Sequence, residues 1–142
     1  MELTYLYHSG FALAGEGFTV VFDYFEDTVS GTEGAVHESL LKRPGRFYVM
    51  SSHSHSDHFN PQVLEWKKVR PDLVFVFSKD ILGHCSVPEG DAVWMEEGDV
   101  YADGLIEVRA FGSTDIGVSF LLEAEGKTIF HAGDLNNWHW MD

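Results

Sequence analysis

The sequence predicts a layered sandwich of the α/β (α+β) class that forms a single domain over residues 1–142. Short runs of aromatic and β-branched residues recur along the chain, which is the pattern of β-strands. Helix signals are fewer and lie between clusters of these runs, an order that favours helices packed against sheets. With 44% hydrophobic residues and no linker or low-complexity tract, the chain can bury one substantial core.

The strands of the first half are short and are separated by turn residues. Gly15-Glu16-Gly17 lies between two apolar runs and predicts a hairpin turn. The predicted strands are Leu3 to Tyr7, Phe11 to Ala14, Phe18 to Phe22, Phe47 to Met50 and Leu73 to Phe77.

In the second half, one segment alternates between apolar and charged side chains. Ile106, Val108 and Ala110 alternate with Glu107 and Arg109, as in a strand with one exposed face. A second turn, at residues 125–127, predicts a hairpin over residues 118–131. The predicted strands are Ala92 to Met95, Ile106 to Phe111, Val118 to Ala124 and Thr128 to His131.

Two segments carry helix signals. Gly34 to Lys42 predicts a short helix that stops before Pro44. Asn60-Pro61 combines an N-cap residue with proline at the first helical position, and apolar residues follow at helical spacing. That helix is expected to end near Arg70-Pro71, because a residue before proline is disfavoured in the helical region.

Acidic residues dominate the charge. Nine Lys and Arg against 23 Asp and Glu give a net charge of −14 at pH 7. A surface this acidic repels phosphate backbones and anionic lipids, so we expect no nucleic-acid and no membrane partner. The single Cys85 rules out an internal disulfide, and the sequence shows no secretory signal or membrane-length apolar stretch. These features predict a cytoplasmic protein.

The segment with the clearest chemistry is residues 50–58, Met-Ser-Ser-His-Ser-His-Ser-Asp-His. It follows a predicted strand and precedes the Asn60-Pro61 helix start. On an extended backbone His53 and His55 point the same way, so they can converge on one ion. Asp57 and His58 come where the chain turns and can face a second ion. Imidazole and carboxylate ligands suit zinc, and iron or manganese also fit.

This His-x-His-x-Asp-His pattern resembles the signature of the metallo-β-lactamase superfamily. Asp23, at the end of an early predicted strand, matches a further position of the family pattern. Asp134 of Gly133-Asp134, after a late predicted strand, matches the aspartate that bridges two metals in the family. Residues 7–11, Tyr-His-Ser-Gly-Phe, resemble the start of the ascorbate-6-phosphate lactonase-like branch, which contains Zn-dependent hydrolases of the β-lactamase fold.

The resemblance implies the αββα fold and two Zn²⁺ ions, with Fe or Mn as alternatives. The implied metal ligands are His53, His55, Asp57, His58 and Asp134. Asp57 and Asp134 are also the implied catalytic residues, orienting the nucleophilic water. Asp23 is expected to orient a ligand histidine through its free ring N–H rather than to bind metal itself.

Two departures from the family pattern matter. The family places another ligand histidine where this chain has Ser113. The site near His53 and His55 is therefore expected to bind its ion more weakly, to use water or Asp134, or to recruit Asp115. The family's last ligand histidine lies on a strand beyond the Gly-Asp, and this sequence stops at Asp142. We therefore expect the C-terminal strands and helix of the fold to be missing, which leaves an exposed sheet edge and favours a homodimer.

The remaining histidines are weaker candidates. His8 is expected at the rim of the site or at a strand end, and His37 on an exposed helix face. His131 is expected to support or pack rather than to bind metal, and His139 to cover the core. His84-Cys85 reads as adjacent residues of a strand, pointing to opposite faces.

The predicted function is hydrolysis of a small ester, lactone or phosphoester by a metal-activated water. The alternative is a metal-binding protein of the same fold without hydrolase activity. A di-iron redox role is disfavoured, because that branch has a carboxylate where this chain has His55. The expected partner is a small-molecule substrate.

Overall fold

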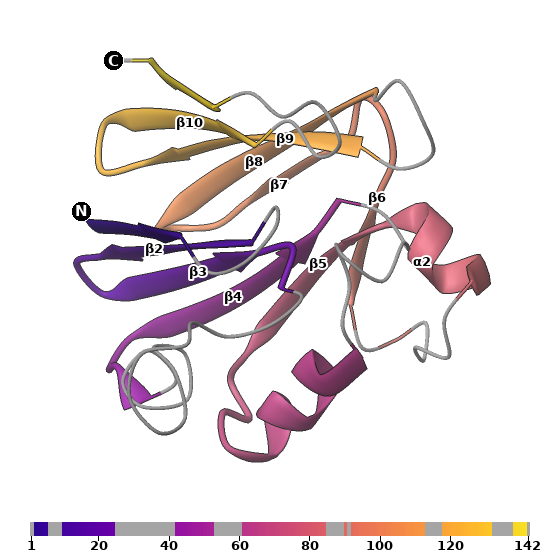
Figure 1. Ribbon diagram of the computed structural model, residues 1–142, viewed down its shortest axis with the longest axis horizontal. Coiled ribbons are helices and arrows are strands. Elements are labelled where there is room, and N and C mark those ends of the chain that lie inside the picture. The colour runs from indigo at the N-terminus through magenta and orange to yellow at the C-terminus, as the bar shows by residue number, and fades with distance from the viewer. Residues whose placement is uncertain are drawn as a thin grey trace.

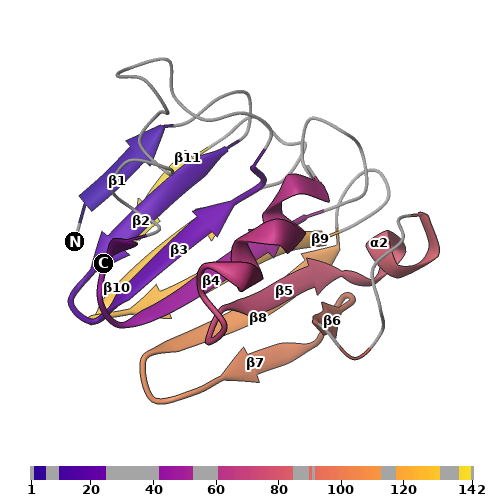
Figure 2. The ribbon, with the colours of Figure 1, turned by 90° about the horizontal axis from the view of Figure 1, so that it is seen from below.

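Two β-sheets face each other, and the helices of the part of the chain that the structure describes lie outside the first of them (Figures 1 and 2). The computed structural model describes residues 2–5, 10–24, 42–52, 61–84, 90, 92–112, 118–131 and 138–141. Among these residues no helix is long and apolar enough to cross a membrane.

The first sheet has six strands in the order in which they occur in the chain. Strands β1 to β3 pair antiparallel, whereas β3 to β6 pair parallel. The strands are β1 (Glu2–Tyr5), β2 (Phe11–Gly15), β3 (Phe18–Phe22), β4 (Arg46–Ser51), β5 (Val74–Ser78) and β6 (Val93–Met95). The parallel strands therefore all end at the same edge of the sheet.

The second sheet is antiparallel throughout, in the order β11-β10-β9-β8-β7. Its outer face carries Glu107, Arg109 and Phe111, while Ile106 and Val108 point inward and are buried. The strands are β7 (Val100–Ala102), β8 (Ile106–Gly112), β9 (Val118–Ala124), β10 (Lys127–His131) and β11 (Trp138–Met141).

The first sheet separates two hydrophobic layers. Val20 and Phe22 of β3 face the second sheet, whereas Val21 faces the helices. Because β3 is covered on both sides, all five of its residues are buried, and its sequence is apolar apart from Thr19. The helices are η2 (Pro61–Lys68), which is a 3₁₀ helix, and α2 (Lys79–His84).

Most predicted elements are confirmed, including both hairpins and the layered α/β arrangement. The helix signal at Pro61 produces a 3₁₀ helix, and the strand predicted from Leu73 begins at Val74. Placing His84 on a strand was wrong, since it ends helix α2. Strands β7 and β11 were not predicted; each is short and exists by pairing with a longer neighbour. The helix predicted from Gly34 lies outside the described residues, apart from Lys42.

Candidate functional site

The carboxyl ends of the parallel strands bring together residues that are distant in sequence. In the β3–β4 ladder Phe22 pairs with Met50, so the two strands end side by side. Asp23 follows β3 directly, and Ser52 follows the end of β4. In open parallel sheets this edge is where ligand sites form.

Asp23 holds Ser52 through both of its carboxylate oxygens. The backbone N–H of Ser52 donates to Oδ1 at 2.6 Å, and its hydroxyl donates to Oδ2 at 2.5 Å. Both residues are fully buried, so these hydrogen bonds compensate a carboxylate that would otherwise be costly to desolvate. Ser52 precedes His53 in the chain, so Asp23 fixes the point from which the histidine motif departs.

The backbone at Asp23 is unusual. Its φ angle is +46°, in the left-handed region, which aspartate tolerates better than most residues. Its N–H donates to the carbonyl of Met50 at 2.7 Å, extending the pairing of β3 with β4. Local strain of this kind concentrates at functional sites, where surrounding contacts hold it in place.

His131, the last residue of β10, reaches the same cluster from the second sheet. Its side chain is 2% exposed, and its ring stacks on Phe22 with a centroid distance of 5.1 Å and an interplanar angle of 9°. Its Nε2 lies 3.7 Å from Oδ2 of Asp23. At that distance the contact is electrostatic, being longer than a normal hydrogen bond.

A further contact between the sheets closes the cluster. The N–H of Val118, at the start of β9, donates to the carbonyl of Ser52 at 2.8 Å. Residues 53–58, 113–117 and 132–134 therefore adjoin three residues of one contact network: Val118 bonds to Ser52, and Ser52 and His131 both meet the carboxylate of Asp23. The described residues next to these three segments in the sequence thus lie at one edge of the sandwich.

The predicted ligands themselves, His53, His55, Asp57, His58 and Asp134, lie outside the described residues, as do Ser113 and Asp115. His8, His37 and Cys85 also lie outside them. Within the described part of the chain, no three His, Cys, Asp or Glu side chains form a potential metal cluster. The structure thus describes residues that immediately precede the predicted ligands in the chain. The assignment of the ligands themselves remains a sequence prediction.

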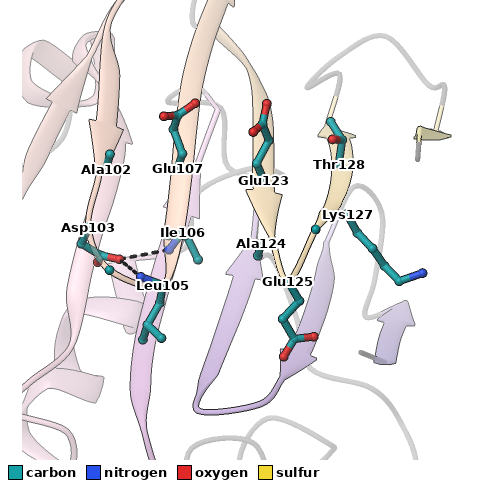
Figure 3. A pocket seen from close by; sticks show the side chains of 12 residues that line it. Ala102, Asp103, Leu105, Ile106, Glu107, Glu123, Ala124, Glu125, Lys127 and Thr128 are labelled. Carbon is teal, nitrogen blue, oxygen red and sulfur yellow. Dashed lines mark hydrogen bonds between the residues drawn. The ribbon is translucent and has the colours of Figure 1, made fainter.

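A polar hollow of about 360 Å³ lies elsewhere, at the far end of the second sheet (Figure 3). Glu107 and Glu123 oppose each other across the β8–β9 ladder and line it. Asp103 belongs to its wall and is already engaged, since its Oδ1 accepts hydrogen bonds from the N–H groups of Leu105 and Ile106. The turn at Asp103 leads into the start of β8, whereas the candidate site adjoins the opposite end of that strand. The hollow is therefore not part of the candidate site.

Sequence reasoning did not identify Ser52 as a site residue. It stood next to the histidine motif as one of several serines, and its partner Asp23 is 29 positions away. The parallel register of β3 and β4 decides this contact, and no local sequence signal reports such a register.

Comparison with known proteins gives a family match over nearly the whole chain. The model of the family described as "Beta-lactamase superfamily domain" matches residues 2–139. A relative from Desulforamulus reducens, named as a metal-dependent hydrolase, is 28% identical over an alignment of 149 residues. That alignment covers 94% of this chain and 62% of the relative, so the chain spans about three fifths of the relative's length.

Solved structures show the same fold. Igni18, a metallo hydrolase from Ignicoccus hospitalis, superposes with a TM-score of 0.68 at 19% identity, over 93% of this chain and 60% of that one. CmlA, a diiron β-hydroxylase from Streptomyces venezuelae, gives a TM-score of 0.66 at 18% identity, over 93% of this chain and 29% of that one. At such identities the likeness establishes the fold alone.

Proposed function

This chain belongs to the beta-lactamase superfamily, in its layered metallo-β-lactamase fold, and from that premise we propose that it is a metal-dependent hydrolase. The observation that carries the proposal is the contact network in which Val118 bonds to Ser52, and Ser52 and His131 both meet Asp23. The histidine motif follows Ser52 in the sequence, and Asp134 follows His131. The relative from Desulforamulus reducens, named as a metal-dependent hydrolase, supports it.

The residues of the segments that follow Ser52 and His131 in the sequence fit a divalent cation. Three imidazoles and two carboxylates stand at positions 53, 55, 57, 58 and 134, a donor set suited to zinc, iron or manganese. In the described part of the chain Asp23 and His131 form a buried carboxylate–imidazole pair, a kind of support that commonly surrounds metal ligands. We propose two ions, Zn²⁺ in the first place, held by His53, His55, Asp57, His58 and Asp134.

Bound divalent ions would lower the pKa of a water molecule towards neutrality and would polarise the scissile bond of the substrate. In that chemistry the carboxylates of Asp57 and Asp134 would orient the water and accept its proton. Asp23 holds the chain at Ser52, so the motif that follows begins from a fixed point. The proposed substrate is a small lactone, ester or phosphoester, since a net charge of −14 disfavours a nucleic acid.

Metal uptake is the first test. The purified chain, supplemented with Zn²⁺ and desalted, should retain metal by elemental analysis, whereas His53→Ala and His58→Ala should retain less. His37→Ala is the matched control, since it removes a histidine outside the motif. A parent protein that retains no metal after supplementation overturns the proposal.

Turnover is the second part of the same test. The metal-loaded protein should hydrolyse a member of a panel of lactones, thioesters and phosphodiesters. Asp57→Ala should lower the rate by about 10²-fold or more, with an unchanged circular dichroism spectrum. Metal binding without turnover by the longest natural form of the protein would replace this proposal with that of a non-enzymatic metal-binding protein.

A further inference from the structure

The proposed metal ligands come from both sheets of the sandwich. His53 to His58 follow β4 in the first sheet, whereas Asp134 follows β10 in the second. Ligands on separate sheets can share ions only when the distance between the sheets is fixed at that edge. The contacts that cross between the sheets there are therefore part of the site's construction.

His131 makes such a contact. It lies in β10, paired with Phe120 of β9, yet its ring stacks on Phe22 and its Nε2 faces Asp23, both at the end of β3. The Asp23 oxygen that it faces, Oδ2, also accepts the hydroxyl of Ser52. One buried carboxylate thus connects the strand that precedes Asp134 with the residue that precedes His53.

We propose that His131 is a positioning residue for the metal site, setting through Asp23 the distance between the two groups of ligands. This inference rests on the proposed function. If the inference is right, tight metal binding requires the polar nitrogen of the His131 ring as well as a ring of that size.

Packing alone does not account for a histidine at this position. The side chain is 2% exposed and stacks on a phenylalanine, so a second phenylalanine would fill the space without burying polar nitrogens. A fully buried carboxylate lies beside it, and the imidazole provides an N–H that faces one of the carboxylate oxygens. The residue thus meets an electrostatic requirement of Asp23 that an apolar ring cannot meet.

Two substitutions separate the ring from its polar group. His131→Phe keeps an aromatic ring for Phe22 and removes the N–H that faces Asp23. His131→Gln removes the ring and keeps an amide N–H of similar reach. Zn²⁺ affinity, measured by competition with a chelator, should fall about tenfold or more in His131→Phe, which is the usual size of such effects. His131→Gln should recover most of the loss.

Spectroscopy and a double-mutant cycle complete the test. The visible absorption spectrum of the Co²⁺-loaded protein should change in His131→Phe and resemble the parent in His131→Gln. Combined with Asp23→Asn, His131→Phe should cause less additional loss of affinity than it causes alone, because the two residues act through each other. Tyr48→Phe is the control, since it removes a buried hydroxyl contact far from this edge and should leave Zn²⁺ affinity unchanged.

Each outcome decides. A parent that binds no Zn²⁺ removes the proposed function and this inference with it. A parent that binds Zn²⁺, with a His131→Phe variant of equal affinity and unchanged Co²⁺ spectrum, overturns the inference alone. Additive losses in the cycle overturn it too. If both His131 variants fail to fold by circular dichroism, the residue is needed for the core and the inference falls.

Discussion

Two adjacent serines at the end of β4 have different environments. Ser52 donates its hydroxyl and its N–H to Asp23, and its carbonyl accepts the N–H of Val118. Ser51 is equally buried, but among the described residues its hydroxyl has no hydrogen-bond partner. Residue type and burial are the same, so the difference lies entirely in the partners. The pair offers a direct measure of what the contact with Asp23 contributes.

Ser52→Ala should lower the free energy of unfolding by about 1.5–3 kcal/mol, because the hydrogen bond it removes is made to a buried carboxylate. Ser51→Ala should leave stability unchanged or raise it slightly, since it removes a buried hydroxyl without a partner. Urea unfolding of both variants measures the difference. Equal effects in the two variants would show that the Ser52 hydroxyl is not held as described.

Among the elements, the β2–β3 hairpin is joined to the start of β4 and the residues before it by hydrogen bonds and a close backbone approach. The N–H of Arg46 donates to the carbonyl of Gly17 at 2.9 Å, and the Arg43 guanidinium donates to the carbonyl of Gly15 at 2.9 Å. At Gly45 the backbone passes so close to the turn that a Cβ would lie 2.3 Å from the carbonyl oxygen of Gly17. The parallel pairing of β3 and β4, which brings Asp23 within hydrogen-bond distance of Ser52, begins at this contact.

Gly45→Ala should therefore destabilise the protein more than Gly98→Ala does. Both glycines have a left-handed backbone, with φ of +95° and +94°, so each variant pays a conformational cost of about 1–3 kcal/mol. Only at Gly45 does the added methyl group also meet backbone, since nothing lies within 4 Å of the Cβ position at Gly98. Chemical denaturation compares the two. A Gly98→Ala variant that is the less stable of the pair would contradict the close approach.

On the scale of the whole molecule, polar contacts join the two sheets at both ends of the apolar layer. At the end opposite the candidate site, the hydroxyl of Tyr48 in β4 donates to Oδ2 of Asp103, before β8, at 2.6 Å. Tyr101 donates to the same oxygen at 3.0 Å. Burial and the hydrogen bond to Asp103 raise the pKa of Tyr48 well above its usual value, so the phenol stays neutral. Burial alone would raise the pKa of Asp103, but hydrogen bonds, chiefly from Tyr48 and the backbone of Leu105 and Ile106, lower it overall.

From the lowered pKa of Asp103 we predict how the stability of the folded protein changes at acid pH. A carboxyl whose pKa falls on folding stabilises the folded state above its ordinary pKa, and the stabilisation is lost as pH falls through the folded-state pKa. The melting temperature of the parent should exceed that of Asp103→Asn near pH 6, and the gap should narrow below about pH 4. Calorimetry between these conditions measures it. A gap that stays constant to about pH 3 would contradict the ionised, hydrogen-bonded Asp103.

The sequence by itself determined the layered fold, both hairpins and most of the strands, and it predicts which residues bind metal. These follow from local information: alternation of apolar residues, glycine turns and a dense group of imidazoles and carboxylates. The sequence did not predict the short strands β7 and β11 or the 3₁₀ form of η2. Each of these depends on a neighbouring element more than on its own residues.

The sequence offered Asp23 and His131 as supports of metal ligands, but only the tertiary structure decided that they contact each other and that Ser52 joins them. Asp23, Ser52 and His131 span more than a hundred positions of the chain and meet because β3 and β4 pair in parallel and β10 lies on the facing sheet. Strand register and sheet packing are set by the whole apolar core, so a local pattern cannot report them. The sequence predicts which residues can bind a metal, and the fold fixes the ends of the strands that precede those residues.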